Sequence, residues 1–188
     1  MIPVYIIIGV VVVLLIILFI LTYNGLVRRR NQVKNAWAQI DVQLKRRFDL
    51  IPNLMETVKG YMKHERGTLE AVTNARNLAQ QVASSGVGER AKAEGELSSA
   101  LSRLLAVVEN YPDLKANQNF LALQEELTST ENKISFSRQF YNDSVLSYNN
   151  QTQMFPSNII ASMTGFKASE FFEVTVATER EAPKVSFT

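Results

Sequence analysis

The feature that most constrains this chain is an uncharged apolar run near its beginning. Residues 2–21 contain no charged side chain, and Arg28, Arg29 and Arg30 follow soon after. A helix rises about 1.5 Å per residue, so roughly 20 apolar residues are enough to cross the hydrocarbon core of a bilayer. Because every backbone group inside lipid must be hydrogen-bonded within the segment, we predict one transmembrane helix, with residues 1–24 as the anchor.

Two other interpretations of the run are a cleaved signal peptide and a buried core helix. A signal peptide has a basic segment before a shorter apolar core, and a small-residue cleavage site after it. Here no basic side chain precedes the run, and no Ala-x-Ala-like triplet follows Leu21. The chain has no cysteine, which excludes a lipoprotein anchor. A core helix rarely stays uncharged over this length, so a retained anchor is favoured.

Basic residues beside the run predict its orientation. Orientation depends on Lys and Arg within about 15–20 positions of a span, and here they lie only on the C-terminal side, at Arg28, Arg29, Arg30 and Lys34. The N-terminus is therefore expected outside and the rest of the chain in the cytoplasm. These four residues form a membrane-proximal basic group, in which a cation near anionic lipid gains about 1 kcal/mol. The second basic stretch, 45–47, is expected on a solvated or inter-subunit face.

Apolar periodicity predicts an all-α fold beyond the anchor. Apolar residues recur every three or four positions from Val33 to Met62, so the membrane helix is expected to continue as the first helix of a bundle, kinked at Pro52. Further helices are predicted over 68–83, 89–110 and 117–155, with a short helical turn over 158–163. The expected organisation is an antiparallel bundle of about four helices at 25–156 and a partly disordered tail at 157–188.

The last long helix carries a seven-residue repeat of large side chains: Phe120, Leu127, Ile134, Tyr141, Tyr148 and Phe155. Such a repeat is typical of left-handed, coiled-coil-like packing. It predicts either a core face within one bundle, which is favoured, or a seam between copies of the chain. Beyond it, an apolar tail is expected to lie at the membrane interface or against a neighbouring protomer: Ile159, Ile160, Met163 and Phe166.

The sequence contains no recognisable catalytic or metal-binding pattern. His64 is the only histidine, and without cysteine it cannot supply a usual transition-metal site. The Gly86-Val87-Gly88 segment lacks the preceding strand and the third glycine of a phosphate-binding loop. The formal net charge is only +2, and no nucleic-acid reading element is present. We therefore predict no enzyme, no cofactor and no nucleic-acid partner.

Several segments resemble the LemA family. They include Asp49-Leu50-Ile51-Pro52-Asn53-Leu54, Glu109-Asn110-Tyr111-Pro112-Asp113, and Phe155-Pro156-Ser157. The resemblance covers nearly the whole chain. It implies a bacterial inner-membrane protein built as a bundle of long antiparallel helices, with no established catalytic activity or cofactor. Relatives that often occur beside membrane metalloproteases suggest a role in envelope organisation or quality control.

Two functions are compatible with these features. The first is a self-assembling, homo-oligomeric scaffold that organises or shapes the membrane. The second is an adaptor or regulator that holds a membrane protease or another membrane partner. The scaffold is favoured because the seven-residue repeat, the basic group and the apolar tail would let many copies pack laterally on lipid.

Overall fold

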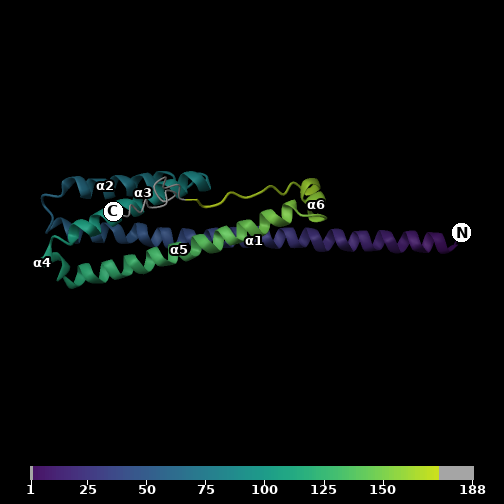
Figure 1. Cartoon of the computed structure of the whole chain (residues 1–188), viewed down its shortest axis with the longest axis horizontal. Coiled ribbons are helices and arrows are strands. Elements are labelled where there is room, and N and C mark those ends of the chain that lie inside the picture. Colours follow the sequence, from purple (N-terminus) through teal and green to yellow (C-terminus); the bar gives the residue numbers. More distant parts are fainter. Residues whose placement is uncertain (1, 174–188) are drawn as a thin grey trace, which may run out of the picture. The chain divides into compact units, whose positions relative to one another are not determined.

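The computed structural model describes residues 2–173, and its regular structure is entirely helical within that range. In chain order the helices are α1 (Ile2–Lys59), α2 (Arg66–Gln81), α3 (Val87–Val108), α4 (Pro112–Lys115), α5 (Gln118–Gln153) and α6 (Ser157–Thr164) (Figure 1). The all-α fold predicted from periodicity is therefore confirmed over the described residues. The disorder expected near the end of the chain falls on residues outside this range.

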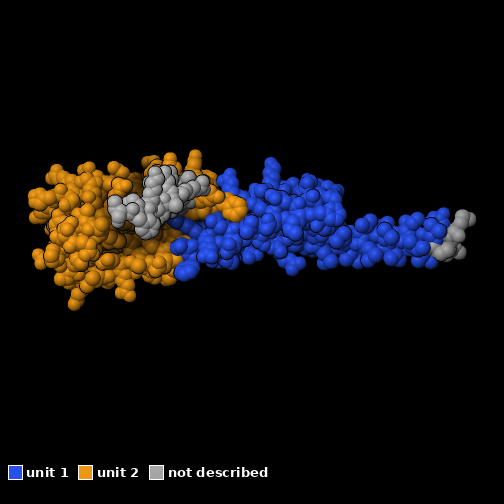
Figure 2. Space-filling view, in the orientation of Figure 1, with its two compact units in different colours: residues 1–42, 135–170 blue, residues 43–134, 171–188 orange. Residues whose placement is uncertain are grey.

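The chain divides into two compact units (Figure 2). Unit 1 holds residues 1–42 and 135–170, and unit 2 holds residues 43–134 and 171–188. Both α1 and α5 contribute one stretch to each unit. The predicted boundaries at residue 24, between anchor and bundle, and at residue 156, between bundle and tail, stay predictions.

The beginning of α1 has the properties of a membrane span. Within the described range, α1 is the one helix that is long and apolar enough to cross a bilayer. Its large apolar side chains from Val4 to Leu21 are exposed rather than buried in a protein core. Exposed apolar surface of this extent needs an apolar surrounding, which supports the membrane anchor over the buried-helix interpretation.

α1 continues past the apolar run without a break to Lys59, as the apolar stripe predicted. Gly25 stays helical, and a Cβ added there would lie 3.0 Å from Nε2 of Gln151, so the missing side chain leaves room for that amide. Pro52 lies inside the helix, which continues for seven further residues. The kink expected at Pro52 stays a prediction.

One segment differs from the sequence interpretation. The stretch 111–116 was expected to lie between the helices predicted over 89–110 and 117–155, but Pro112–Lys115 forms the one-turn helix α4. Proline suits the first helical turn because its φ is already fixed near the helical value and its missing N–H would have no partner there. Asn117 then caps α5, since its Oδ1 accepts hydrogen bonds from the backbone N–H groups of Asn119 (2.9 Å) and Phe120 (3.1 Å).

Unit 2 is built around one apolar core. Side chains from α1, α2, α3, α4 and α5 meet in it, among them Ile51, Leu54, Val58, Val72, Leu97, Leu101, Leu104, Leu114, Phe120 and Leu127. Two polar pairs show the helix direction: Arg47 of α1 bonds Glu131 of α5, and Tyr61 after α1 accepts from Asn117 before α5. Positions that rise along α1 therefore meet positions that fall along α5, which confirms antiparallel packing in this unit.

Unit 1 combines the remaining stretches of α1 and α5 with α6. Arg29 lies beside Ser147, and the ring of Trp37 lies 5.3 Å from that of Tyr141, so α1 and α5 are antiparallel here too. A small apolar cluster contains Leu26, Ile160 and Ala161. α6 ends at Gly165, whose φ of 75° is the left-handed conformation that glycine adopts without strain. α6 confirms the short helical turn predicted over 158–163.

Candidate membrane-proximal site

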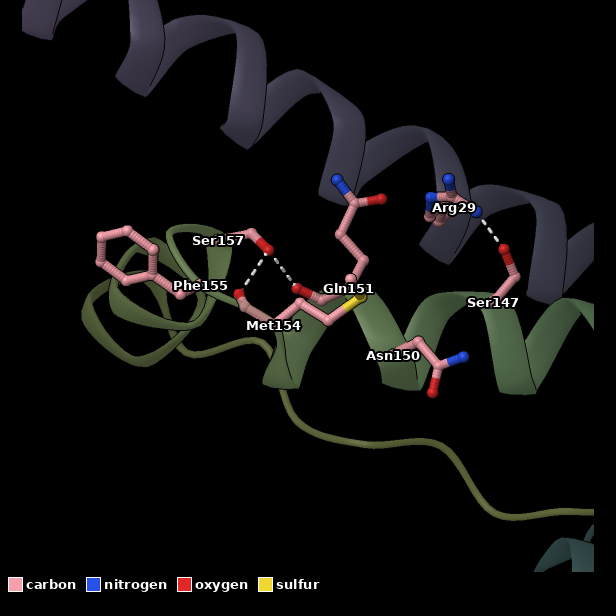
Figure 3. A pocket seen from close by; sticks show the side chains of 7 residues that line it. All are labelled: Arg29, Ser147, Asn150, Gln151, Met154, Phe155 and Ser157. Carbon is pink, nitrogen blue, oxygen red and sulfur yellow. Dashed lines mark hydrogen bonds between the residues drawn. The ribbon is translucent and has the colours of Figure 1, made fainter.

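The candidate site begins where the apolar part of α1 ends. Arg28, Arg29, Arg30 and Lys34 are all exposed on the turns of α1 that follow Leu21. Arg28 Nε donates to the carbonyl of Asn24 in its own helix at 3.4 Å. Arg29 instead donates to Ser147 Oγ of α5 (Figure 3). The basic group predicted from the sequence is therefore continuous along α1, and one of its members also contacts α5.

Arg30 contacts the first of three aromatic rings that pack against one another in sequence. Its guanidinium carbon lies 4.8 Å from the ring centroid of Phe166, a cation–π distance. Phe166 in turn meets Tyr23 edge-on at 5.8 Å, and Tyr23 stacks on Phe19 at 6.3 Å. These contacts join the chain after α6 to the last turns of the apolar segment.

The structure separates the four residues of the predicted apolar tail. Ile160 is buried beside Leu26, and Phe166 packs against the same cluster. Ile159 and Met163 are exposed, Met163 at 74%. Adjacent residues on a helix differ by about 100° in direction, so Ile159 and Ile160 cannot face the same surroundings. Only Ile159 and Met163 therefore offer apolar surface to lipid or to another chain.

The seven-residue repeat is also divided by the structure. Phe120, Leu127, Ile134, Tyr141 and Tyr148 are buried within the chain, whereas Phe155 is 80% exposed. Phe155 differs because α5 ends at Gln153, two residues before it. The first five positions thus pack as a core face, and Phe155 alone of the six offers exposed surface.

Phe155 lines a cavity of about 420 Å³ together with Arg29, Ser147, Asn150, Gln151, Met154 and Ser157 (Figure 3). Ser157 Oγ shares its one proton between the backbone carbonyls of Gln151 (2.6 Å) and Met154 (2.8 Å), which ties down the turn between α5 and α6. In the close view, Arg29 lies at one end of the cavity and Phe155 at the other. The cavity is therefore cationic and polar at one end and apolar at the other.

A feature that sequence reasoning missed is the strap, residues 166–170, which runs along α5. Tyr148 Oη donates to the carbonyl of Lys167 and Tyr141 Oη to that of Glu170, each at 2.9 Å. Asn149 forms a reciprocal pair with Ser169, donating to its carbonyl at 2.9 Å and accepting from its N–H at 2.8 Å. Two of the buried repeat positions are tyrosines, Tyr141 and Tyr148, and a buried tyrosine hydroxyl needs a hydrogen-bond partner. These hydroxyls were the feature of the sequence that could have indicated the strap.

The strap affects the tyrosines that hold it. Burial raises the pKa of Tyr141, and the nearby carboxylate of Glu170 raises it further. Burial also raises the pKa of Tyr148, partly offset by the positive charge of Arg30. Both hydroxyls therefore stay protonated as donors over the physiological range.

Unit 2 contains a second feature that the sequence interpretation got wrong. Arg47 was expected on a solvated or inter-subunit face, but it is fully buried. Its guanidinium pairs with Glu94 of α3, and with Glu131 of α5 at 2.5 Å, and donates to Ser98 Oγ at 2.7 Å. The signal was its spacing: Arg47 lies three residues after Leu44 and four before Ile51, on the apolar stripe.

The described residues hold no group of three or more His, Asp or Glu side chains placed to bind a metal ion. His64, the one histidine, is exposed just after α1. Some buried polar side chains instead join helices to each other or to the strap, as Arg47 and Tyr141 do.

An apolar helix that continues into an antiparallel helical bundle, with a basic group at the junction, defines a membrane-anchored helical protein. The sequence profile of the LemA family matches residues 36–187, which is most of the chain. The chain therefore belongs to the LemA family, as the resemblance implied.

Relatives support this assignment. The chain is 29% identical over 163 residues to protein LemA of Metamycoplasma hominis, covering 82% of this chain and 73% of that protein. It is 26% identical over 192 residues to magnetosome protein MamQ 2 of Paramagnetospirillum magneticum, covering 87% and 71%. It is 24% identical over 188 residues to magnetosome protein MamQ of Magnetospirillum gryphiswaldense, covering 85% and 69%.

Proposed function

We propose that this LemA-family protein is a non-catalytic, membrane-anchored scaffold whose copies associate side by side through unit 1. The observation that carries the proposal is an apolar patch on α5 formed by Phe136 and Phe140, which lie one helical turn apart. Phe136 is 72% exposed, and Phe140, one turn later, is exposed beside it. Exposed aromatic clusters of this kind mark surfaces that contact another molecule.

A second copy is the occupant that best fits this patch. Anchored chains share one plane and one orientation, which raises their effective concentration for lateral contact. The repeat positions on the opposite side of α5 are already buried inside the chain, so the exposed patch replaces them as the contact surface. Membership of the LemA family and similarity to magnetosome proteins fit a membrane-associated protein.

The continuity of α1 supports a scaffold over a flexible tether. The helix runs from the apolar segment to Lys59 with no loop between them. Gly25 is packed against the Gln151 side chain, so the residue best able to loosen the helix is held in place. Lateral contacts between copies would therefore act directly on the spacing and tilt of the membrane helices.

The size of the full chain in mild detergent tests the proposal. We expect a uniform particle larger than one chain, and we expect Phe136→Ser with Phe140→Ser to reduce it to a monomer. Leu121→Ser is the matched control, because Leu121 is also an exposed apolar residue of α5 but lies in unit 2. A monomeric parent protein would overturn the scaffold and leave the adaptor, whose partner would be a membrane protease or another membrane protein.

The orientation is part of the same proposal, with the bundle in the bacterial cytoplasm as Arg28–Arg30 and Lys34 predict. Because the chain has no cysteine, Gln139→Cys gives a single exposed thiol beside the apolar patch. A bis-maleimide should cross-link neighbouring copies through it, and an impermeant maleimide should label it only after the cells are opened. Labelling of intact cells would contradict the orientation.

A further inference from the structure

The membrane-proximal part of unit 1 carries positive charge without any carboxylate. Residues 22–40 and 144–169 contain no Asp or Glu, but they include Arg28, Arg29, Arg30, Lys34 and Lys167. Elsewhere in the described chain, cations such as Arg46 and Arg47 are paired with carboxylates. The charges next to the apolar helix therefore lack acidic side chains in these two stretches, which favours an anion from outside the chain.

The cavity at Arg29 gathers hydrogen-bonding groups beside this charge. The side chains of Asn150 and Gln151 line it, and Ser147 accepts one hydrogen bond from Arg29 (Figure 3). A guanidinium has five N–H donors, so a single bond to a hydroxyl leaves most of its donors available. Arginine also suits phosphate in particular, because its planar fork donates two parallel hydrogen bonds.

The opposite end of the cavity is apolar and exposed. Met154 and Phe155 line this end, and both side chains are mostly exposed. Ile159 and Met163, on the following helix α6, are exposed as well. A cavity with a cationic, polar end and an apolar end matches a ligand that has both characters, as a phospholipid has in its phosphate and its glycerol ester region.

The position along α1 places the Arg29 backbone just beyond the layer of lipid headgroups. Arg29 follows Tyr23 by six residues, which is about 9 Å along a helix. The polar headgroup layer extends roughly 5–8 Å beyond the hydrocarbon core on each side. A long arginine side chain can direct its charge along the helix toward this layer, so a phosphate there lies within its reach.

We propose that this cavity binds the phosphate headgroup of an anionic phospholipid. Arg29 pairs with the phosphate, Asn150 and Gln151 offer amide hydrogen bonds, and Met154 with Phe155 covers the glycerol region. The inference deepens the proposed function by naming a lipid site, and it rests on the membrane anchor but not on lateral association of copies.

Native mass spectrometry of the full chain in detergent tests the site. The protein is supplied with equal amounts of phosphatidylglycerol and phosphatidylcholine, and the lipid retained per chain is counted. We expect preferential retention of phosphatidylglycerol. Arg29→Gln and Arg28→Gln both lose the general attraction of one near-surface charge. Arg29→Gln should lose about fivefold more retention than Arg28→Gln, because it also loses a direct hydrogen-bonded contact worth about 1 kcal/mol. Arg28→Gln removes the same charge from a neighbouring residue that does not line the cavity.

Two outcomes would overturn the proposal. Equal losses in Arg29→Gln and Arg28→Gln would show a diffuse charge effect with no specific site, and equal retention of the two lipids would show that the anionic charge is not recognised. Inorganic phosphate at millimolar concentration should leave phosphatidylglycerol bound. Displacement of phosphatidylglycerol by inorganic phosphate would show a site for free phosphate and would contradict a lipid site.

Further variants separate this proposal from folding and from self-assembly. Met154→Ser with Phe155→Ser should weaken lipid retention while leaving Arg29 in place, and unchanged retention would contradict contact with the glycerol region. The fluorescence of Trp37, the one tryptophan and a member of unit 1, reports whether each variant is folded. The native mass spectra also show the number of chains per particle. Loss of lipid with an unchanged number of chains therefore distinguishes the lipid site from self-assembly.

Discussion

Units 1 and 2 share the helices α1 and α5 but hold them together in different ways. In unit 2, five helices enclose a continuous apolar core, crossed by the buried Arg47 and its two carboxylate partners. In unit 1, α1 and α5 also bury apolar side chains, among them Ala36, Ile40 and Val145. The strap there is fastened to α5 by hydrogen bonds from Tyr141, Tyr148 and Asn149. Both units therefore bury apolar side chains, but unit 2 adds a buried charge network and unit 1 adds several separate neutral hydrogen bonds.

The difference predicts where each unit is vulnerable. Removing one partner from a buried ion network leaves an uncompensated charge and costs about 3–5 kcal/mol. A neutral hydrogen bond contributes about 0.5–1.5 kcal/mol net, so no single bond of the strap is critical. We expect unit 1 to open locally, strap first, while unit 2 loses its structure cooperatively.

The largest effect is expected when the charge network of unit 2 is broken. Arg47→Met should lower the free energy of unfolding by about 3–5 kcal/mol, because Glu94, almost fully buried, keeps its charge without a partner. Loss of helical circular dichroism with denaturant in detergent measures this change. Arg47→Met combined with Glu94→Leu should recover much of the loss, since the buried charge is then gone.

Arg46→Met is the matched control for that change. Arg46 pairs with Glu126 at 2.6 Å, but their side chains are 46% and 40% exposed. Exposed ion pairs contribute about 0–1 kcal/mol, so the control should lose at most that amount. Equal losses for the two arginines would contradict a special role for the buried network.

The same contrast explains what could be predicted from the sequence. The apolar run, the stripe of α1 and the short turn over 158–163 are local patterns, and each predicted an element close to the observed one. Arg47 was misassigned because its neighbours Lys45 and Arg46 suggested a charged surface, although its spacing matched the core. A run of basic residues shows where charges lie in the sequence. It does not show whether a charge is buried, because that depends on the carboxylates that other helices supply.

The strap could not be predicted because its order comes from outside its own sequence. Residues 166–170 have no apolar period, and their backbone groups are bonded to side chains about 20 to 30 positions earlier. The cavity at Arg29 likewise depends on a non-local contact, because Arg29 of α1 lines it together with Gln151 of α5 and Phe155 of the following turn. Helix propensity and apolar periodicity describe neighbouring residues only, so they cannot predict contacts between residues far apart in the sequence.

A smaller effect is expected when the strap loses its strongest attachment. Asn149→Ala removes both hydrogen bonds to Ser169, so the strap should open more often, by about 1–3 kcal/mol. Hydrogen exchange of the Ser169 amide measures the opening. Gln153→Ala is a control on the same helix, because Gln153 is exposed and should leave that exchange rate unchanged. If the Ser169 amide exchanged as slowly in Asn149→Ala as in the parent protein, the result would contradict a strap held by these hydrogen bonds.

The smallest effect is the response of unit 1 to high pH. Unfolded tyrosine loses its proton near pH 10, whereas burial holds the pKa values of Tyr141 and Tyr148 higher in the folded chain. As the pH rises past 10, the unfolded chain binds fewer protons than the folded one, so the contribution of these tyrosines, complete below pH 10, is lost as the pH passes the folded pKa values.

Denaturant midpoints from Trp37 fluorescence at pH 9 and pH 11 measure this response, since the Trp37 ring lies 5.3 Å from Tyr141. Tyr141→Phe with Tyr148→Phe should lower stability at pH 9 but reduce the further loss between the two values. Tyr61→Phe, an exposed tyrosine of unit 2, should leave that loss as in the parent. Lysines also titrate in this range, so the difference between variants carries the result. An unchanged loss in the double variant would mean that the strap does not depend on protonated tyrosines.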